Sequence, residues 1–227
     1  MPLPASIAID GPAAVGKSTV GRIVASQLGY HFIDTGEMYR SLTWLALHEG
    51  IAMDDATSLA RLAGEATIDL RSRSDVIHGS VLINGRDVTD AIHTPSVEAS
   101  VSHVSRVPAV REAMVAKQRS MARQEKVVMA GRDIGTVVLP QAGLKVFLTA
   151  PLKQRAHRRH CEQQSKGMEA NYEAIFADLE RRDKIDTHRP VSPLRPAADA
   201  RVIDTQGLTP EQVAGVIVKL AKEVDCR

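Results

Sequence analysis

Short apolar runs alternate with longer segments of helical periodicity along most of the chain. Apolar runs at 6–10, 31–33, 126–130, 144–150 and 201–204 predict strands, and periodic segments predict helices at about 17–28, 36–49, 109–124, 152–164, 170–187 and 210–223. Such alternation is typical of an α/β protein in which helices flank both faces of a parallel sheet. Ligands of such sheets bind at the carboxyl ends of the strands, so the residues after each strand are candidate site residues.

One segment departs from this alternation. Residues 66–89 show short alternating runs and an Asn84-Gly85 pair, which is a hairpin signal. Helical periodicity returns at 95–105, and Pro108 marks the start of another helix. The pattern predicts a small antiparallel insert within about 60–105, carried by a single domain that covers 1–227.

Composition narrows the function classes. The 227 residues have a formal net charge of +2 and only 3% aromatic residues, so we expect no nucleic-acid partner that relies on charge and stacking. Neither a signal segment nor an apolar run of about 18 residues is present, so we expect no membrane partner and a cytoplasmic location. Cys161 and Cys226 lack metal-site spacing, and Cys161 and His160 are interpreted as solvated helix residues.

The first apolar run is followed by a phosphate-binding motif. Gly11, Gly16, Lys17 and Ser18 match the G-x-x-x-x-G-K-[ST] spacing, between a predicted strand and a predicted helix. Glycines let backbone N–H groups turn toward phosphate oxygens, the lysine reaches the terminal phosphates, and the serine hydroxyl can hold Mg²⁺. The alternative is an ordinary glycine turn with a solvated lysine. The motif predicts a P-loop site for a nucleoside triphosphate and Mg²⁺, without indicating which nucleotide.

Four other stretches are rich in polar groups at predicted strand ends and nearby helices: 34–40, 102–111, 131–136 and 181–189. Arg182, Asp186 and Arg189 share one helix face, which suits either an anion site or an intrahelical salt-bridge ladder. Arg132 and Asp133 suit either a ligand edge or a turn with an exposed ion pair. Arg40 is either a ligand or a surface arginine. Their coincidence at strand ends favours a second binding site.

These stretches resemble those of the bacterial cytidylate (CMP) kinases, within the nucleoside monophosphate kinase family. The resemblance rests on "IDGPAAVGKST", "DTGEMYR", "GRDIGTVV", "KVFLTA", "RAHRR", "RRDKIDTHR", "PAADA" and "VIDT", in order from residue 7 to about 220. It implies a P-loop fold with a CMP-binding insert, and transfer of the γ-phosphoryl group of ATP to CMP or dCMP. It also implies a mobile lid at about 152–170. The enclosed site of such a kinase suggests a monomer.

The resemblance also implies roles for individual residues. Lys17, Arg40, Arg132 and Arg189 would act in catalysis. The residues expected to bind ATP are Gly11, Pro12, Ala13, Ala14, Val15, Gly16, Lys17, Ser18, Thr19, Arg155, Arg158 and Arg159, with Ser18 on the metal. The last three arginines could equally form a solvated basic face. The residues expected to bind CMP are Thr35, Arg40, Ser102, Arg111, Arg132, Asp133, Arg182, Asp186 and Arg189.

Three positions depart from the family pattern. Val15 stands in the loop interior where small residues are frequent, Ala130 where an acidic residue is common, and His93 where arginine is frequent. We expect slower or retuned activity from them. The alternative functions are a kinase for another nucleotide such as UMP, a shikimate- or gluconate-type kinase, a GTPase-like switch, and a nucleic-acid ATPase. The insert argues against the metabolite kinases, and the GTPase and nucleic-acid ATPase motifs are missing.

Overall fold

The computed structural model describes residues 3–71, 79–123, 126–165 and 167–224. The chain divides into two compact units, Met1–Tyr30 with Lys126–Arg227 and His31–Glu125, called here the first and second units. Cys161 is an exposed free thiol, as predicted, whereas Cys226 lies outside the described residues. Within the described ranges, no helix is both long enough and apolar enough to span a bilayer.

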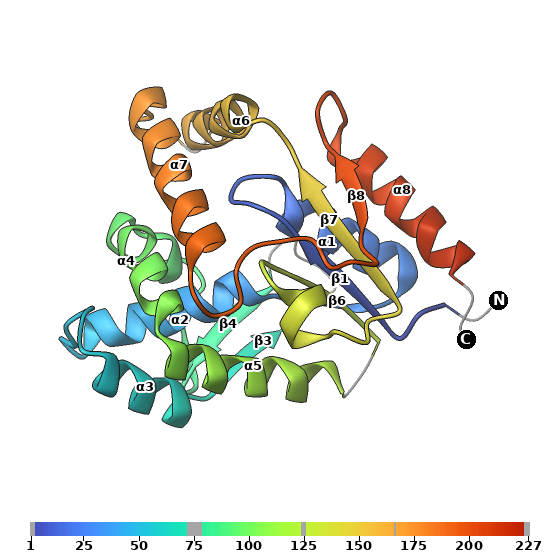
Figure 1. The fold of residues 1–227 in the computed structure, drawn as a ribbon. Coiled ribbons are helices and arrows are strands. Elements are labelled where there is room, and N and C mark those ends of the chain that lie inside the picture. Colours follow the sequence, from blue (N-terminus) through green and yellow to red (C-terminus); the bar gives the residue numbers. More distant parts are fainter. Residues whose placement is uncertain (1–2, 72–78, 124–125, 166, 225–227) are drawn as a thin grey trace. The chain divides into compact units, whose positions relative to one another are not determined.

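The central sheet confirms the predicted α/β class. Its strand order is β2-β6-β1-β7-β8, and Figure 1 labels β6, β1, β7 and β8. The strands are β1 (Ser6–Asp10), β2 (His31–Asp34), β6 (Val127–Gly131), β7 (Leu144–Thr149) and β8 (Arg201–Asp204). The pairs β1–β6, β1–β7 and β7–β8 are parallel, so their carboxyl ends share one edge. That edge carries Gly11, Arg132 and Thr205 directly after their strands.

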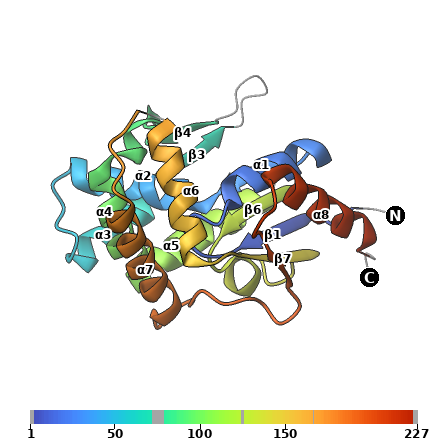
Figure 2. The same cartoon turned by 90° about the horizontal axis from the view of Figure 1, so that it is seen from above.

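Four helices belong to the first unit: α1 (Lys17–Leu28), α6 (Leu152–Ser165), α7 (Tyr172–His188) and α8 (Pro210–Glu223). α1 packs against α8, and α6 packs against α7 (Figure 2). Sequence-local signals explain their ends. α8 begins with a capping box between Thr209 and Gln212, and α1 ends at Gly29 with a left-handed φ of 67°.

The second unit contains the predicted antiparallel insert. Its small sheet has the order β3-β4-β5, with β3 (Ile68–Arg71), β4 (Ser80–Ile83) and β5 (Arg86–Asp87). Asn84 and Gly85 both have positive φ, 50° and 77°, as a two-residue hairpin turn of the predicted kind requires. The part of the predicted insert at 72–78 lies outside the described residues.

The second unit also contains the helices α2 (Thr35–His48), α3 (Ala56–Glu65), α4 (Pro95–Arg106) and α5 (Pro108–Ala122). α4 and α5 begin at prolines, as the sequence predicts. The sequence interpretation missed α3, although Asp55 caps it and Leu59, Leu62 and Ala63 form its buried face. Two single-turn elements were also missed, η1 (Ala91–His93) and the π-helical η2 (Ile134–Val138).

Candidate active site

The loop between β1 and α1 has a backbone that only glycine permits at two points. Gly11 has a φ of 149°, and a Cβ on it would lie 2.4 Å from the carbonyl oxygen of Leu148. Gly16 has a φ of 97° and leads directly into the first turn of α1. Backbone N–H groups in such a turn, together with a helix N-terminus, favour a bound anion. The loop therefore has the backbone that the motif predicts.

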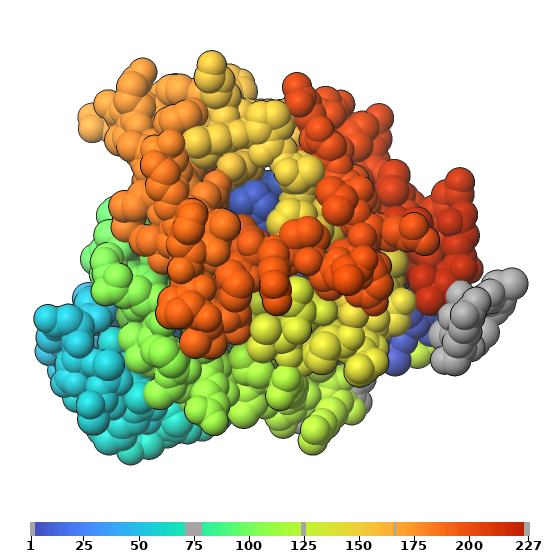
Figure 3. Space-filling model, in the orientation of Figure 1, coloured from blue at the N-terminus to red at the C-terminus, as the bar shows by residue number. Residues whose placement is uncertain are grey.

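The motif lysine is bound to the loop itself. Lys17 is only 8% exposed, and its Nζ donates to the carbonyl oxygens of Gly11 at 2.8 Å and Pro12 at 2.6 Å. Both bonds hold the ammonium group beside the loop, which rules out the solvated lysine of the alternative interpretation. Ser18 is partly buried and Thr19 exposed on the next positions of α1. In Figure 3 this N-terminal region, in blue, is visible at the bottom of a hollow.

Strain in the loop interior falls on Ala14 and not on Val15. Ala14 has a φ of 56°, a left-handed conformation that costs a residue with a Cβ about 1 kcal/mol or more. Val15, which stands where the family often has a small residue, is 1% exposed and does not have a positive φ. Ala13 is buried in an apolar cluster with Ala156, Ile175 and Leu179 of α6 and α7. Small side chains at 13 and 14 thus let these helices pack against the loop.

The first of the three arginines of α6 is an internal group, not part of a solvated basic face. Arg155 is 5% exposed and donates to the carbonyl oxygens of Ala13 at 3.0 Å and Ala150 at 3.1 Å. Its third partner is Asp183 Oδ2 of α7 at 2.6 Å. The other oxygen of Asp183 is buried and has no hydrogen-bond partner among the described residues. Arg155 of α6 therefore links that helix both to the phosphate loop and to α7.

The other two arginines of α6 have different surroundings. Arg158 donates to the side chain and the carbonyl of buried Thr205, at 3.0 and 2.7 Å. It thereby connects α6 with the loop after β8. Arg159 forms an ion pair with Glu162, with 3.1 Å between Nη1 and Oε2, and a third of the Arg159 side chain is exposed. Of the three, Arg159 alone matches the solvated alternative.

A compact charged cluster lies in the same unit, formed by the loop after β6 and the end of α7. The Nε of Arg132 donates to Asp186 Oδ2 at 2.7 Å. Arg189 lies 3.6 Å from Asp133 and 3.9 Å from Asp186, measured between nitrogen and carboxylate oxygen. Asp133, Asp186 and Arg189 are all at most 7% exposed. These four predicted site residues are brought together.

The cluster contradicts two alternatives that the sequence left open, an intrahelical salt-bridge ladder on α7 and an exposed ion pair in the turn after β6. The short bond of Asp186 is to Arg132, 54 positions away, so the residues of α7 do not form a self-contained ladder. Arg182 is instead 3.8 Å from Asp178 on its own helix. Asp133 is 5% exposed, so an exposed turn pair with Arg132 is also wrong. Burial favours a raised pKa for Asp186, but Arg132, Arg189 and Arg182 outweigh it and lower that pKa.

The second unit carries the remaining predicted substrate residues. Thr35 is buried in the first turn of α2, which Asp34 caps by accepting from Gly36 N at 2.8 Å. Arg40 follows on α2, and its buried Nε has no hydrogen-bond partner among the described residues. The guanidinium of Arg40 approaches Gly36 so closely that a Cβ there would lie 3.1 Å from Nη1.

The base-reading candidates lie on neighbouring helices of this unit. Ser102 on α4 and Arg111 on α5 are 5% and 2% exposed. Arg111 donates to the carbonyl oxygen of Ser105 at 3.2 Å and lies over the ring of Tyr39, 5.6 Å from its centroid. The bond to Ser105 and the ring of Tyr39 therefore orient Arg111, and Tyr39 is an orienting residue that the sequence did not single out. Of the family departures, Ala130 is buried in β6 and His93 is exposed.

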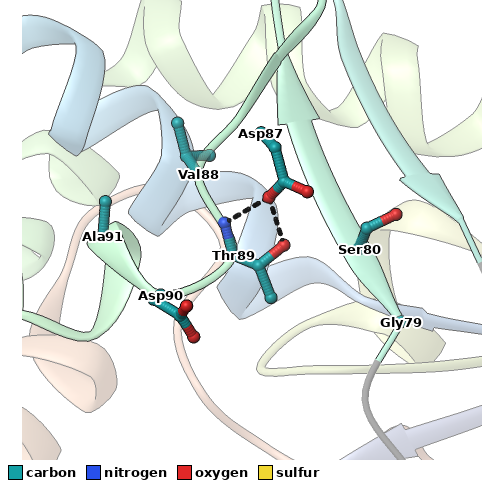
Figure 4. Close-up of a pocket in the computed structure, with 7 residues that line it drawn as sticks. All are labelled: Gly79, Ser80, Asp87, Val88, Thr89, Asp90 and Ala91. Carbon is teal, nitrogen blue, oxygen red and sulfur yellow. Dashed lines mark hydrogen bonds between the residues drawn. The ribbon is translucent and has the colours of Figure 1, made fainter. Parts of the chain in front are cut away.

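A cavity of about 470 Å³ adjoins the hairpin of the second unit (Figure 4). Asp87 accepts from the backbone N–H and the hydroxyl of Thr89, at 3.0 and 2.6 Å, and Asp90 is also in the lining. In the parts of the chain that the structure describes, the charged side chains that line this cavity are the carboxylates of Asp87 and Asp90, which do not favour a bound phosphate. Among the described residues there is also no group of three or more His, Cys, Asp or Glu side chains that could hold a metal.

Sequence reasoning missed one buried acid in the first unit. Asp10 ends β1, is 4% exposed, and accepts from the backbone N–H groups of Ile134 and Gly135, each at 2.7 Å. The available signal was a carboxylate at the end of an otherwise apolar strand. Burial raises the pKa of Asp10 to about 6, although both backbone bonds act to lower it.

Comparisons with known proteins show the family of this chain. The family model described as "Cytidylate kinase" matches residues 7–223. A cytidylate kinase from Geobacillus sp. (strain WCH70) is 47% identical over 96% of this chain and 96% of its own length. A bifunctional pantoate ligase/cytidylate kinase from Synechococcus sp. (strain JA-2-3B'a(2-13)) is also 47% identical over 96% of this chain, which spans 40% of that protein.

One solved structure supports the fold alone. The crystal structure of an uncharacterized protein from Eubacterium ventriosum ATCC 27560 has a TM-score of 0.51 and 11% identity, and the likeness covers 96% of this chain and 98% of that one. The extent and identity of the sequence matches are far more specific. The chain belongs to the cytidylate kinase family.

Proposed function

We propose that this chain is a kinase that transfers the γ-phosphoryl group of ATP to CMP or dCMP, giving ADP and CDP or dCDP. The observation that carries the proposal is the cluster of Arg132, Asp133, Asp186 and Arg189 in the unit that also holds the phosphate loop. Membership in the cytidylate kinase family supports the same activity.

The donor site would be built on the phosphate loop. The backbone N–H groups of the loop from Ala13 to Thr19 would bind the ATP phosphates, with Gly11 and Pro12 shaping its start, and Lys17 would exchange the carbonyls of Gly11 and Pro12 for phosphate oxygens. The hydroxyl of Ser18 would be a ligand of Mg²⁺, which when bound neutralises charge on the phosphates. Gly11 leaves no room for a Cβ, and Gly16 has the positive φ that favours glycine, so the loop suits this close approach of an anion to the backbone.

The acceptor would be bound by arginines. Its phosphate is mostly dianionic at pH 7, since its second pKa is about 6, and so it attacks without a general base. The obstacle is repulsion from the triphosphate, about 4 kcal/mol per pair of unit charges at 4 Å and an effective dielectric constant of 20. Arg132 and Arg189 would offset this repulsion by bidentate contacts, and so would Arg40, whose Nε has no hydrogen-bond partner in the part of the chain that the structure describes. Thr35 would assist at the same phosphate.

Two further groups would recognise the pentose and the base. Arg182 and Asp186 would bind the pentose hydroxyls. Asp133 would accept from the exocyclic amine of cytosine, and Ser102 and Arg111 would donate to its ring acceptors. Uracil carries a carbonyl in place of that amine and would be repelled by the carboxylate. Burial of all three base-reading residues at 5% exposure or less makes such a mismatch costly.

Closure over ATP would come from α6 and the residues that follow it, at about 152–170. In the described structure Arg155 and Arg158 already connect α6 with the phosphate loop and with Thr205. Exclusion of water by such a lid would suppress hydrolysis of ATP. We further propose that the protein acts in the cytoplasm as a monomer, as one domain whose partners are small nucleotides.

The test is a coupled assay of ADP formation with ATP, Mg²⁺ and each of CMP, dCMP, UMP, AMP and GMP. We expect CMP and dCMP to have the highest kcat/KM. Lys17→Met should abolish turnover, whereas Lys219→Met on α8, an exposed lysine 3.9 Å from Glu223, should not. A preference for UMP would favour the second candidate, a UMP kinase, and turnover with none of the five would contradict both.

A further inference from the structure

We propose that Asp10 is a positioning residue that fixes the Arg132–Asp133 segment relative to the phosphate loop. Asp10 is the last residue of β1, directly before Gly11, and it pairs in register with Gly131 of β6. The acceptor residues Arg132 and Asp133 come next after that glycine. One carboxylate thus stands between the two substrate sites. Its kinetic consequences, though not its structural role, rest on the proposed function.

The geometry of the contact is specific to a carboxylate. Oδ1 of Asp10 accepts from Ile134 N and Oδ2 from Gly135 N, both at 2.7 Å and both buried. Two consecutive N–H groups need two acceptor oxygens on one side chain. An asparagine amide supplies one oxygen and presents N–H donors to the second backbone N–H, so it cannot replace both bonds. These donors belong to the start of η2, where the π-helical turn reorients the chain after Asp133.

The fit around this contact leaves little room for movement. A Cβ on Gly135 would lie 3.3 Å from Asp10 Oδ2 and 3.2 Å from Cδ of Lys145 on β7. The turn is therefore enclosed by β1 on one side and by the Lys145 chain on the other. Lys145 is itself held by Asp199, whose two oxygens lie 2.9 and 3.0 Å from its Nζ. A shift of η2 would carry Asp133 and Arg132 with it.

Charge adds to this arrangement. Burial raises the pKa of Asp10 to about 6, the Ile134 and Gly135 bonds and Lys17 lower it, and Asp133 raises it. Lys145, the remaining charged group beside the turn, contacts it through its alkyl chain. Above about pH 6 the group is therefore a buried carboxylate, and charge-assisted bonds of this kind are about twice as strong as neutral ones. Protonation of Asp10 should weaken the hold on η2.

The first experiment needs no substrate. In the wild-type protein, the amide proton shifts of Ile134 and Gly135 are followed by NMR from pH 5 to pH 7.5, with Ala8 of β1 as the control amide. We expect the two amides to titrate together with a midpoint near 6, and Asp10→Asn to abolish the titration. Asp133→Asn serves to separate the neighbouring acid, and the titration should persist in it. The contact would be overturned if the amide proton shifts of Ile134 and Gly135 did not change with pH in the wild-type protein. Loss of their titration in Asp133→Asn would also overturn it.

The second experiment asks whether the contact serves catalysis. Asp10→Asn is compared with Ile9→Val, which trims a fully buried side chain one position earlier on the same strand and so serves as a control for general destabilisation. For Asp10→Asn we expect kcat/KM for CMP to fall about tenfold to a hundredfold, the effect of a small misplacement of binding groups, with KM for ATP changed less than about threefold. Ile9→Val should leave both constants within about twofold of wild type.

A third variant tests the same contact independently, in case Asp10→Asn does not fold. Gly135→Ala keeps the carboxylate but places a Cβ against it and against Lys145, so it should show the same selective loss for CMP. Equal losses for CMP and ATP in both Asp10→Asn and Gly135→Ala would overturn the positioning role. Failure of the wild-type protein to phosphorylate CMP would instead overturn the proposed function and leave the NMR result to stand by itself.

Discussion

Replacing Arg155 with methionine tests whether this arginine is a structural link or a free ligand of ATP. Methionine keeps most of the aliphatic stem and removes the guanidinium. The change takes away three bonds at once, to the carbonyl oxygens of Ala13 and Ala150 and to Asp183. It also removes the positive charge with which the Asp183 carboxylate is paired.

The expected cost follows from burial. The side chains of Arg155 and Asp183 are 6% and 22% exposed, and breaking a buried ion pair on one side costs about 3–5 kcal/mol. Water reaches Asp183, so the lower end of that range applies, about 3 kcal/mol. For a chain of this length this corresponds to a fall in Tm of roughly 6–12 °C. The matched control is Arg159→Met on the same helix, whose exposed pair with Glu162 is worth about 0–0.5 kcal/mol.

The assay is urea unfolding of the substrate-free proteins, followed by circular dichroism. We expect Arg155→Met to be less stable than Arg159→Met by about 2.5 kcal/mol or more. If the two variants differ by less than about 1 kcal/mol, the three bonds of Arg155 contribute no net stability, and the reasoning from burial is refuted.

Three further predictions concern other parts of the first unit. Ala14→Gly should raise the free energy of unfolding by about 0.5–1 kcal/mol by removing the left-handed strain, as measured by urea unfolding; an unchanged or lower value contradicts this. Asp133→Ala should lower CMP turnover and narrow the preference for CMP over UMP in kcat/KM, and unchanged discrimination would count against its base-reading role. Burial of the ionised Asp10 carboxylate costs more free energy than its two backbone bonds return, so its folded pKa of about 6 lies above the ordinary 3.8. Although ionisation strengthens the local bonds to η2, the stability that neutral Asp10 provides is present below about pH 4 and is lost as the pH rises through about 6. Relative to Asp10→Asn, the wild-type protein should therefore lose roughly 3 kcal/mol of unfolding free energy across that interval, and parallel pH curves would exclude the shift.

The parts of the fold that the sequence predicts are those set by neighbouring residues. Strands such as Ser6–Asp10, the prolines that begin α4 and α5, and the Asn84-Gly85 turn all depend on local apolar periodicity or backbone preference. The phosphate loop is predictable for the same reason, because its glycines and lysine are adjacent in the chain. α3 carried a similar signal in its cap and its apolar face but was missed as a separate element.

The partners of the site residues were not predictable, because they depend on contacts between distant segments. The bond between Arg132 and Asp186 joins residues 54 positions apart, and Asp10 reaches 124 positions to Ile134. The same applies to Arg155, whose basic neighbours suggested a solvated face until its contact with Ala13 was seen. Periodicity gives the face of a helix on which a residue lies, but only packing decides whether that face is buried.

The central claim is that arginines from separate segments bind a single phosphate of CMP facing the phosphate loop. The most direct measurement is a crystal structure with CMP and a non-hydrolysable ATP analogue. We expect guanidinium nitrogens of Arg40, Arg132 and Arg189 to lie about 3 Å from oxygens of the CMP phosphate. We also expect the ammonium group of Lys17 to contact the triphosphate of the ATP analogue. CMP bound elsewhere, or these three arginines on separate surfaces with none touching its phosphate, would contradict it.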